Sequence, residues 1–385
     1  MNISILGVGM TKFGELWDLS PTKIARVAIE EALLSSRVEP RQIEAAFVGN
    51  MLSGILGNQE NLGSFFAEHK GFANIPAFKL EGACASGALA LHNAVNSILA
   101  GVYKTVLVLG VEKMTDHESG DVTSALMAAG SEAERLAGAT FPGLYALIAR
   151  SYMQKYHITE EDMAYVAVKN HYHGSLNPKA QFRFPVTVAQ VLKSTKIADP
   201  LKLLDSSPVS DGAAAVVLTS DPRLISKIKT PVHILASEVA TDTLSLHKRK
   251  SFTSLEAAVI AGEKAYKKAG VGAKDIDVAE VHDCFSIAEI IALEDLGFSQ
   301  KGKGAKDIKS GKFTLGKSSG LVVNSSGGLK ACGHPVGATG VKQIAEIVEQ
   351  LRGDAGQRQV RGAKIGLTHN VGGSGAVAAV HILGI

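Results

Sequence analysis

Cysteine is scarce in this chain of 385 residues, which contains only three. Cys84, Cys284 and Cys332 form no Cys-x-x-Cys pair, and no His or Cys cluster has the spacing of a structural metal site. An odd number of cysteines in a chain of this size argues against a disulfide framework and favours a reducing compartment. We therefore expect no metal centre and a cytoplasmic location.

Long apolar runs and a strong net charge are also lacking. No segment approaches the ~20 consecutive apolar residues that cross a membrane, and residues 1–7 are typical of a first strand, not of a signal peptide. The net charge of +3 is too small to indicate a nucleic-acid partner, although it suits an anionic substrate. With 46% hydrophobic and 20% charged residues, the composition is that of an ordered globular protein.

An internal repeat predicts the fold class. Two segments match in residue type at a constant offset of 233 positions, and each is typical of an amphipathic helix, a short turn and a buried strand. The matching residues are Ala25, Ala28, Ala32, Val38, Ile43, Ala46 and Val48, and then Ala258, Ala261, Ala265, Val271, Ile276, Ala279 and Val281. Beyond the strand, Gly49-Asn50 corresponds to His282-Asp283, so the second copy carries the polar chemistry.

Later elements show where the repeat is interrupted. Residues 106–110 resemble 365–369, and residues 211–215 resemble 374–378, with offsets of about 260 and 163. The first half therefore holds roughly 95 extra residues after Gly110. We predict a first half at 1–111 and 209–235, an inserted subdomain at 112–208, and a second half at 236–385. Within the second half, residues 301–320 are expected to form a long loop.

Alternation of helix and strand patterns indicates a mixed α/β architecture, in which helices cover buried sheets. Two similar halves predict a pseudo-twofold arrangement. Functional loops are then expected to meet at the strand ends between the halves.

The strongest candidate nucleophile is Cys84, in Gly82-Ala83-Cys84-Ala85-Ser86-Gly87. An apolar, alanine-rich stretch at 88–100 follows and predicts a helix. A thiol at a helix N-terminus faces unpaired N–H groups, which favour the thiolate. The alternative is a buried packing residue, and two distant histidine motifs argue against it.

Three further loops carry candidate chemistry. His282-Asp283-Cys284-Phe285 lies between a buried strand and a helix from about Ser286, and helix capping accounts for Asp283 but not for His282 or Cys284. His334 lies among the glycines of residues 327–340 and before Pro335, an arrangement that holds an imidazole rigidly. Residues 369–375, His-Asn-Val-Gly-Gly-Ser-Gly, form either a glycine turn or a set of oriented N–H groups for an oxyanion.

Together these segments resemble the thiolase superfamily over essentially the whole chain. Cys84-Ala85-Ser86 resembles its nucleophile motif, Gly333-His334-Pro335 its histidine motif, and residues 211–215 the strand that follows its loop domain. Most other thiolases have Asn-Glu-Ala-Phe in place of His282-Asp283-Cys284-Phe285 and a catalytic Cys-x-Gly in place of residues 369–371. Both departures are similar to sterol-carrier-protein-type thiolases and to archaeal acetoacetyl-CoA thiolases.

The resemblance implies a fold and a reaction. The fold would be two βαβαβαββ halves in a five-layered α-β-α-β-α core with an inserted loop domain. The reaction would be the reversible Claisen condensation of two acetyl-CoA into acetoacetyl-CoA and CoA, which feeds the mevalonate pathway to isoprenoids. CoA itself is the acyl carrier, so no dissociable cofactor is expected.

The resemblance also implies residue roles. Cys84 would be the nucleophile, His334 its activator, and Cys284 the acid and base of the second step. His282 and His334 would bind the thioester oxygen, and a second oxyanion hole would use the N–H of Cys84 and one near Val371 and Gly372. His369 would either orient Cys284 or be the base itself. The candidates for binding the CoA phosphates are His247, Lys248, Arg249 and Lys250, together with Lys193, Lys196 and Lys202 of the insertion. Such a run of charged residues is also typical of a solvent-exposed face without a ligand.

Alternative functions share parts of this pattern. A hydroxymethylglutaryl-CoA synthase or a ketoacyl synthase shares the cysteine and histidine, but the former needs a glutamate acid, for which only Glu81 is at hand. A degradative 3-ketoacyl-CoA thiolase for longer chains remains open, as does a non-catalytic acyl-CoA or lipid carrier or scaffold. The resemblance further implies a homodimer or homotetramer, and a complex with hydroxymethylglutaryl-CoA synthase through a small bridging protein. It implies no nucleic-acid or membrane partner.

Overall fold

The computed structural model describes residues 3–69, 71–72, 74–318 and 320–385. The bounds of the longer helices are α1 Pro21–Ser36, α3 Ser86–Leu99, α6 Phe141–Tyr156, α7 Glu160–Ser175, α10 Glu256–Ala269, α11 Ser286–Asp295 and α14 Val336–Arg352. The shorter ones are α2 Leu62–Ala67, α4 Ser119–Met127, α5 Glu132–Leu136, α8 Val188–Lys193, α9 Pro222–Ile225, α12 Gly304–Lys309 and α13 Gly328–Cys332. Within these described ranges, no helix combines the length and apolarity that a membrane crossing requires.

Ten strands form one sheet in the order β10-β9-β11-β12-β8-β1-β7-β4-β2-β3. Their bounds are β1 Ser4–Met10, β2 Ala45–Gly49, β3 Ala77–Leu80, β4 Thr105–Glu112, β7 Gly212–Thr219, β8 Val232–Thr241, β9 Val278–Glu280, β10 Val322–Val323, β11 Ile365–Gly372 and β12 Val377–Gly384. Outward from the β8–β1 junction, the two sides repeat the same antiparallel and parallel pairings. This symmetry confirms the duplication predicted from the sequence.

The sheet register refines the offsets between the halves. Ala45 pairs with Val106, and its counterpart Val278 pairs with Gly366, so β4 and β11 are offset by 260 positions. Gly212 lies opposite Glu112, as Val377 lies opposite Gly372, so β7 and β12 are offset by 165. The difference, 95 positions, agrees with the roughly 95 extra residues expected in the first half.

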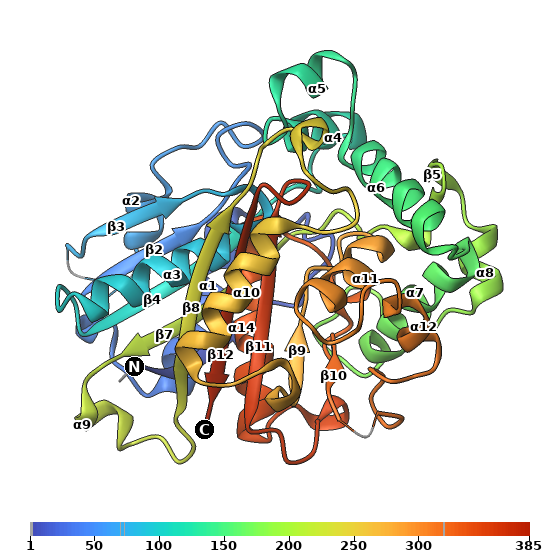
Figure 1. The fold of residues 1–385 in the computed structure, drawn as a ribbon. Coiled ribbons are helices and arrows are strands. Elements are labelled where there is room, and N and C mark those ends of the chain that lie inside the picture. Colours follow the sequence, from blue (N-terminus) through green and yellow to red (C-terminus); the bar gives the residue numbers. More distant parts are fainter. Residues whose placement is uncertain (1–2, 70, 73, 319) are drawn as a thin grey trace.

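Helices cover the two halves of the sheet in alternate layers (Figure 1). On β4, Val106 and Val108 belong to the apolar cluster formed with α3 and α14, whereas Leu107 and Leu109 belong to the cluster formed with α1. In the second half, the cluster of α3 and α14 includes Val278 of β9, while the other face packs against α10. The junction between β1 and β8 is only two residue pairs long, so the halves fold over the α3–α14 layer. The predicted five-layered α-β-α-β-α arrangement is confirmed.

The central helices α3 and α14 approach closely at glycines near their N-termini. A Cβ atom on Gly87 would lie 2.6 Å from the carbonyl oxygen of Gly337, and one on Gly340 would lie 2.3 Å from the backbone nitrogen of Ala88. Only residues without a side chain permit this approach. Because Cys84 precedes α3 and His334 precedes α14, the contact brings the two candidate residues together.

Between β4 and β7 the chain forms α4 to α8 and a small hairpin of β5 Lys196–Ala198 and β6 Leu201–Lys202. In Figure 1 this segment lies beside α11 and α12 of the second half. The long loop predicted at 301–320 is wrong in part, because α12 occupies its middle and buries Ala305 and Ile308 in the core. Two apolar residues in a lysine- and glycine-rich segment gave too weak a periodicity to indicate that turn of helix.

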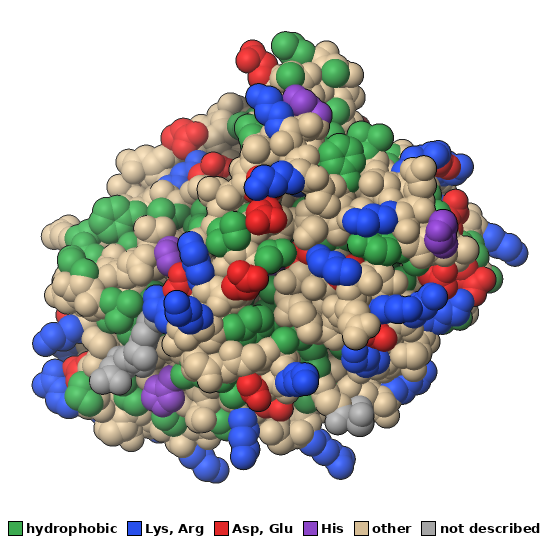
Figure 2. All heavy atoms as spheres, in the orientation of Figure 1, with side chains coloured by type: hydrophobic (Ala, Val, Ile, Leu, Met, Phe, Trp, Pro, Cys, Tyr) green, Lys and Arg blue, Asp and Glu red, His purple; other side chains and the backbone are tan. Residues whose placement is uncertain are grey.

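Figure 2 shows one face of the molecule, on which Lys and Arg side chains are interspersed with Asp and Glu. The small excess of positive charge is therefore not gathered into a basic patch on this face.

Candidate active site

A hydrogen-bonded turn presents Cys84 at the N-terminus of α3. The turn is a short 3₁₀ segment, Ala83–Ala85, and Ala83 has a left-handed φ of 53°, which is uncommon for a residue with a side chain. The N–H of Ala83 donates to Glu81 Oε1 at 2.5 Å, and Ser86 Oγ donates to the carbonyl of Ala83 at 2.6 Å. Glu81, the weak candidate for a catalytic acid, therefore serves to hold this turn.

Burial, more than the helix terminus, decides the protonation of Cys84. The side chain is only 9% exposed, and its burial raises the pKa of the thiol to about 12, against the smaller lowering by the N–H groups of Gly373 and of Cys84 itself. The negative charges of Glu112 and Glu81 raise it further. Although a helix N-terminus favours the thiolate, burial outweighs it here, so Cys84 is a thiol that needs a base.

His334 is placed to be that base. Its Nδ1 lies 2.7 Å from Thr339 Oγ1, whose hydroxyl donates to the carbonyl of Pro335 at 3.0 Å. Because the single hydroxyl proton of Thr339 is donated to Pro335, Nδ1 of His334 must be the donor in its bond to Thr339, and Nε2 carries the lone pair. Nε2 is buried and has no hydrogen-bond partner among the described residues. Burial lowers the pKa of His334 to about 3, with a smaller contribution from Lys342, so the imidazole is neutral.

His282 lies beside His334 in the opposite tautomer. Asn370 Nδ2 donates to His282 Nδ1 at 3.1 Å, so the proton of His282 is on Nε2, which is also buried without a partner. The two rings are 5.2 Å apart and nearly perpendicular, at 82°. Burial, then the neighbouring His334 and His369, lower the pKa of His282. One ring thus offers an acceptor and the other a donor.

Cys84, His282 and His334 form a compact cluster, in which the thiol and one ring nitrogen of each histidine all lie within 4.8 Å of one another. A neutral base within reach of a thiol is the arrangement that activates a nucleophile. A thiol and two imidazoles are also ligands that Zn²⁺ accepts, so the expectation of no metal stays a prediction.

Cys284 faces the same cavity as Cys84 and His334, a space of about 280 Å³. Its other walls are mainly apolar and include Leu126, Phe141 and Val336. Burial raises the pKa of the Cys284 thiol well above its usual value, the charge of Cys84 raises it further, and a hydrogen bond with Tyr145 lowers it. The four residues predicted to be catalytic are therefore neighbours in space.

Asp283 joins the two histidine loops. Its carboxylate accepts hydrogen bonds from the N–H of Leu329 at 2.6 Å and of Lys330 at 3.3 Å, and from Asn170 Nδ2 at 2.7 Å. It therefore caps α13, which precedes His334, and not α11 as the sequence suggested. This cap fixes the loop of His282 against the loop of His334.

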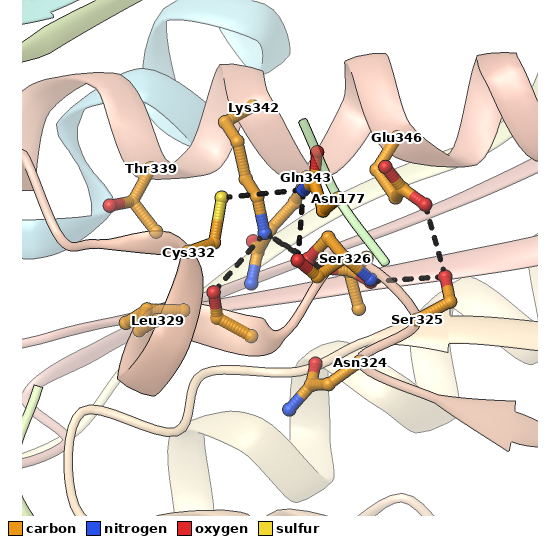
Figure 3. A network of polar contacts seen from close by, with 12 residues as sticks. Asn177, Asn324, Ser325, Ser326, Leu329, Cys332, Thr339, Lys342, Gln343 and Glu346 are labelled. Carbon is orange, nitrogen blue, oxygen red and sulfur yellow. Dashed lines mark hydrogen bonds and ion pairs between the residues drawn. The ribbon is translucent and has the colours of Figure 1, made fainter. Parts of the chain in front are cut away.

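A buried polar network continues along α14 behind this loop, and Figure 3 shows it at close range. Lys342 Nζ lies 2.9 Å from Glu280 Oε2 and also bonds Ser326 Oγ, while Gln343 Nε2 donates to the carbonyl of His369 at 3.0 Å. Thr339, which holds His334, is one turn away on the same helix. The network ties α14 to the second half of the sheet and so fixes the base.

The predicted second oxyanion hole, which uses the N–H of Cys84 and one near Val371 and Gly372, stays a prediction. Val371 and Gly372 are paired with Ala378 and Val377 in the sheet, and the N–H that contacts the Cys84 sulfur comes from Gly373. His369 lies buried on β11, and in the part of the chain that the structure describes its two ring nitrogens have no hydrogen-bond partner. Burial lowers the pKa of His369 to about 4. Its proposed role in orienting Cys284 therefore stays a prediction.

The predicted phosphate contacts divide into buried and exposed residues. Arg249 is buried and bonds Ser374 Oγ at 3.1 Å, and Lys202 is buried beside Glu160, so neither presents its charge to solvent. Lys193, Lys196, His247, Lys248 and Lys250 are exposed. Their contact with CoA stays a prediction.

Sequence reasoning missed Tyr145 of α6, which lines the cavity with its hydroxyl next to Gly373 and Cys284. It lies in the aromatic-rich part of the insertion, but no motif surrounds it. Gly373 was within the predicted loop, and only the turn geometry singles it out.

Comparisons with known proteins cover nearly the whole chain. The family described as "Thiolase, N-terminal domain" matches residues 3–222, and "Thiolase C-terminal domain-like" matches residues 238–385. The "Acetyl-CoA acetyltransferase" of Methanothermobacter thermautotrophicus is 48% identical over 382 residues, which are 99% of each chain. Human "Sterol carrier protein 2" is 35% identical over 396 residues, and the match covers 97% of this chain and 70% of that protein.

The solved structure titled "Ltp2-ChsH2(DUF35) aldolase" has a TM-score of 0.84 with this structure at 24% identity, covering 99% of this chain and 97% of the other. At that identity the likeness concerns the fold alone.

Proposed function

The chain belongs to the thiolase family and is an acyltransferase, and on this basis we propose that it is an acetyl-CoA C-acetyltransferase working through an acyl-enzyme on Cys84. The observation that carries the proposal is the cluster of Cys84, His282 and His334 within 4.8 Å, with Cys284 on the same cavity. The name shared by its archaeal relatives supports acetyl-CoA as the substrate.

In the first half-reaction, His334 Nε2 takes the proton of Cys84. The thiolate attacks the carbonyl carbon of acetyl-CoA, a C–S bond to Cys84 forms, and the C–S bond to CoA breaks. The departing CoA thiolate takes the proton of Cys284. The N–H of Cys84 and one near Val371 and Gly372 would bind the developing oxyanion.

In the second half-reaction, a new acetyl-CoA binds and the Cys284 thiolate removes a proton from its methyl carbon. The enolate attacks the acetyl group on Cys84, a C–C bond forms, and the bond to Cys84 breaks. The imidazolium of His334 returns its proton to Cys84. His282 Nε2–H is the donor for the enolate oxygen, because its tautomer is already fixed by Asn370.

The loss of acetoacetyl-CoA enolate absorbance on adding CoA tests the proposal. Wild-type protein is expected to cleave acetoacetyl-CoA, whereas Cys84→Ala and Cys284→Ala are inactive. Cys284→Ala should still become acylated on Cys84, but more slowly, since the first step keeps its nucleophile and base and loses only the proton donor for the departing CoA. Cys332→Ala is the control, because Cys332 is buried outside the cavity and its loss should leave turnover intact.

A series of longer 3-ketoacyl-CoA substrates extends the same assay. Faster cleavage of long chains than of acetoacetyl-CoA would replace the biosynthetic function by the degradative one. Inactivity of the wild type on every chain length would exclude a thiolase and favour a non-catalytic carrier or scaffold.

The cellular setting is also a proposal. A cytoplasmic homodimer or homotetramer would supply acetoacetyl-CoA to a hydroxymethylglutaryl-CoA synthase in the mevalonate pathway, joined through a small bridging protein. Removal of the product by a following irreversible step would draw the unfavourable condensation forward. Light scattering of the pure protein tests the oligomer, and co-elution with the synthase, with and without the bridging protein, tests the complex.

A further inference from the structure

The hydroxyl of Tyr145 lines the cavity that Cys84, Cys284 and Gly373 share. Tyr145 is buried on α6 with its ring against Phe285 at 4.8 Å between centroids, which fixes the direction of the hydroxyl beside Cys284. The hydroxyl donates to the carbonyl of Gly373 at 3.2 Å. No step described above uses it.

The geometry allows the phenol proton to change partners. A distance of 3.2 Å is long for an O–H···O bond, which is usually below about 3.0 Å, so the bond to Gly373 is weak. While Cys284 is a thiol, its S–H can donate to the phenol oxygen. When Cys284 is a thiolate, the phenol proton gains a charged acceptor, and charge-assisted hydrogen bonds are the stronger kind.

The two cysteines have different donors. The sulfur of Cys84 faces the backbone N–H groups of Gly373 and Cys84, whereas the sulfur of Cys284 faces the Tyr145 hydroxyl. We propose that the Tyr145 hydroxyl is the hydrogen-bond donor that stabilises the Cys284 thiolate, which makes Tyr145 a positioning residue of the second half-reaction. The role of that thiolate rests on the proposed function above.

Other charges face Cys284 and form the background to this effect. Lys330 of α13 favours the thiolate, while the charges of Cys84 and of the adjacent Asp283 oppose it. The Tyr145→Phe variant leaves all three in place, and the ring still fills its site beside Phe285. It therefore removes the donor and little else.

The first test uses a Cys84→Ala background, in which Cys284 is the cysteine that lines the cavity. Alkylation of Cys284 by iodoacetamide is followed by peptide mass spectrometry across pH, with Cys332 as the internal reference. Tyr145→Phe should move the alkylation profile to higher pH and slow the reaction roughly ten- to hundredfold at a fixed pH. An unmoved profile, or one shifted to lower pH, overturns the proposal.

Tyr266→Phe is the matched control, because the Tyr266 hydroxyl also donates to a backbone carbonyl, that of Leu296, and lies off the cavity. It should leave the profile unchanged. If Tyr145→Phe unfolds more readily than this control, global replacement of tyrosine by 3-fluorotyrosine supplies a second reading. The more acidic phenol should move the profile to lower pH, and no movement contradicts the proposal.

Measuring the two half-reactions separately distinguishes this inference from the proposed function. With otherwise wild-type protein, Tyr145→Phe should still form the acyl-enzyme on Cys84 but exchange the methyl protons of acetyl-CoA with D₂O more slowly. Slowed acylation with normal exchange would assign Tyr145 to the Gly373 turn instead. If the wild-type protein forms no acyl-enzyme, the proposed function is wrong. The pH profile of Cys284 alkylation would still test the interaction of Tyr145 with Cys284.

Discussion

The two halves of the molecule contain equivalent strands and helices, but they contribute differently to the active site. In the first half, Gly49 ends β2, and a Cβ there would lie 2.5 Å from the Cα of Gly87, so the position serves close packing. In the second half, the corresponding position is His282, whose ring enters the active site. The same strand end thus packs a helix in one half and supplies a hydrogen-bond donor in the other.

Strands β4 and β11, which correspond in the two halves, show the same division. Glu112 at the end of β4 accepts hydrogen bonds from the N–H groups of Met51, Leu52 and Gly337 at 3.0 to 3.1 Å. Burial raises its pKa to about 7. Its counterpart Gly372 ends β11 and leads into the turn whose Gly373 N–H faces Cys84. A duplicated scaffold therefore keeps its geometry in both halves and places most of its chemistry in one.

The largest effect is expected when His282 of the second half is replaced by glycine, the residue at the corresponding position of the first half. His282→Gly removes the donor for the enolate oxygen, and the loss of one such donor typically costs about 10²–10³ in rate. Steady-state turnover should fall by that factor. His233→Gly is the control, because His233 bonds Ser4 outside the cavity. Turnover of His282→Gly within a factor of two of wild type would remove His282 from the mechanism.

A smaller effect is expected at the helix crossing that the two halves share. Gly340→Ala places a Cβ against the backbone of Ala88, and overpacking of this kind destabilises by about 1–3 kcal/mol. Denaturant unfolding should show that loss, and acylation should slow as Cys84 and His334 separate. Gly120→Ala on α4, where a Cβ meets open space, should lower neither the stability nor the rate. Equal behaviour of the two variants would contradict the role given to the crossing.

Much of this comparison could be predicted from the sequence. The spacing of the alanines revealed the repeat, because residues on the packed face of a helix recur with the period of the helix. Cys84, Cys284 and His334 could be found because each lies in a short, continuous sequence motif. The protonation of Cys84, the cap made by Asp283 and the donor Tyr145 could not be predicted. Each depends on burial or on contacts between segments far apart in the chain, such as Asp283 with Leu329 or Tyr145 with Gly373.

The smallest expected effect concerns the acid stability of the second half. The pKa of His369 is lowered from 6.5 to about 4 by burial, so the unfolded chain binds a proton more readily than the folded one between these values. Stability should therefore fall as the pH falls from 6.5 to 4. His369→Leu should make this decline shallower by up to one proton, as urea unfolding at several pH values would show. An unchanged decline in His369→Leu would contradict the account.

The central claim is that the two halves meet to make Cys84 a nucleophile, and the intact mass of the protein after brief mixing with acetyl-CoA and an acid quench tests it most directly. The account predicts a gain of one acetyl group, mapped by peptide analysis to Cys84 and strongly slowed in His334→Ala. Absence of acetyl on Cys84, or acetyl on Cys284 instead, would contradict it.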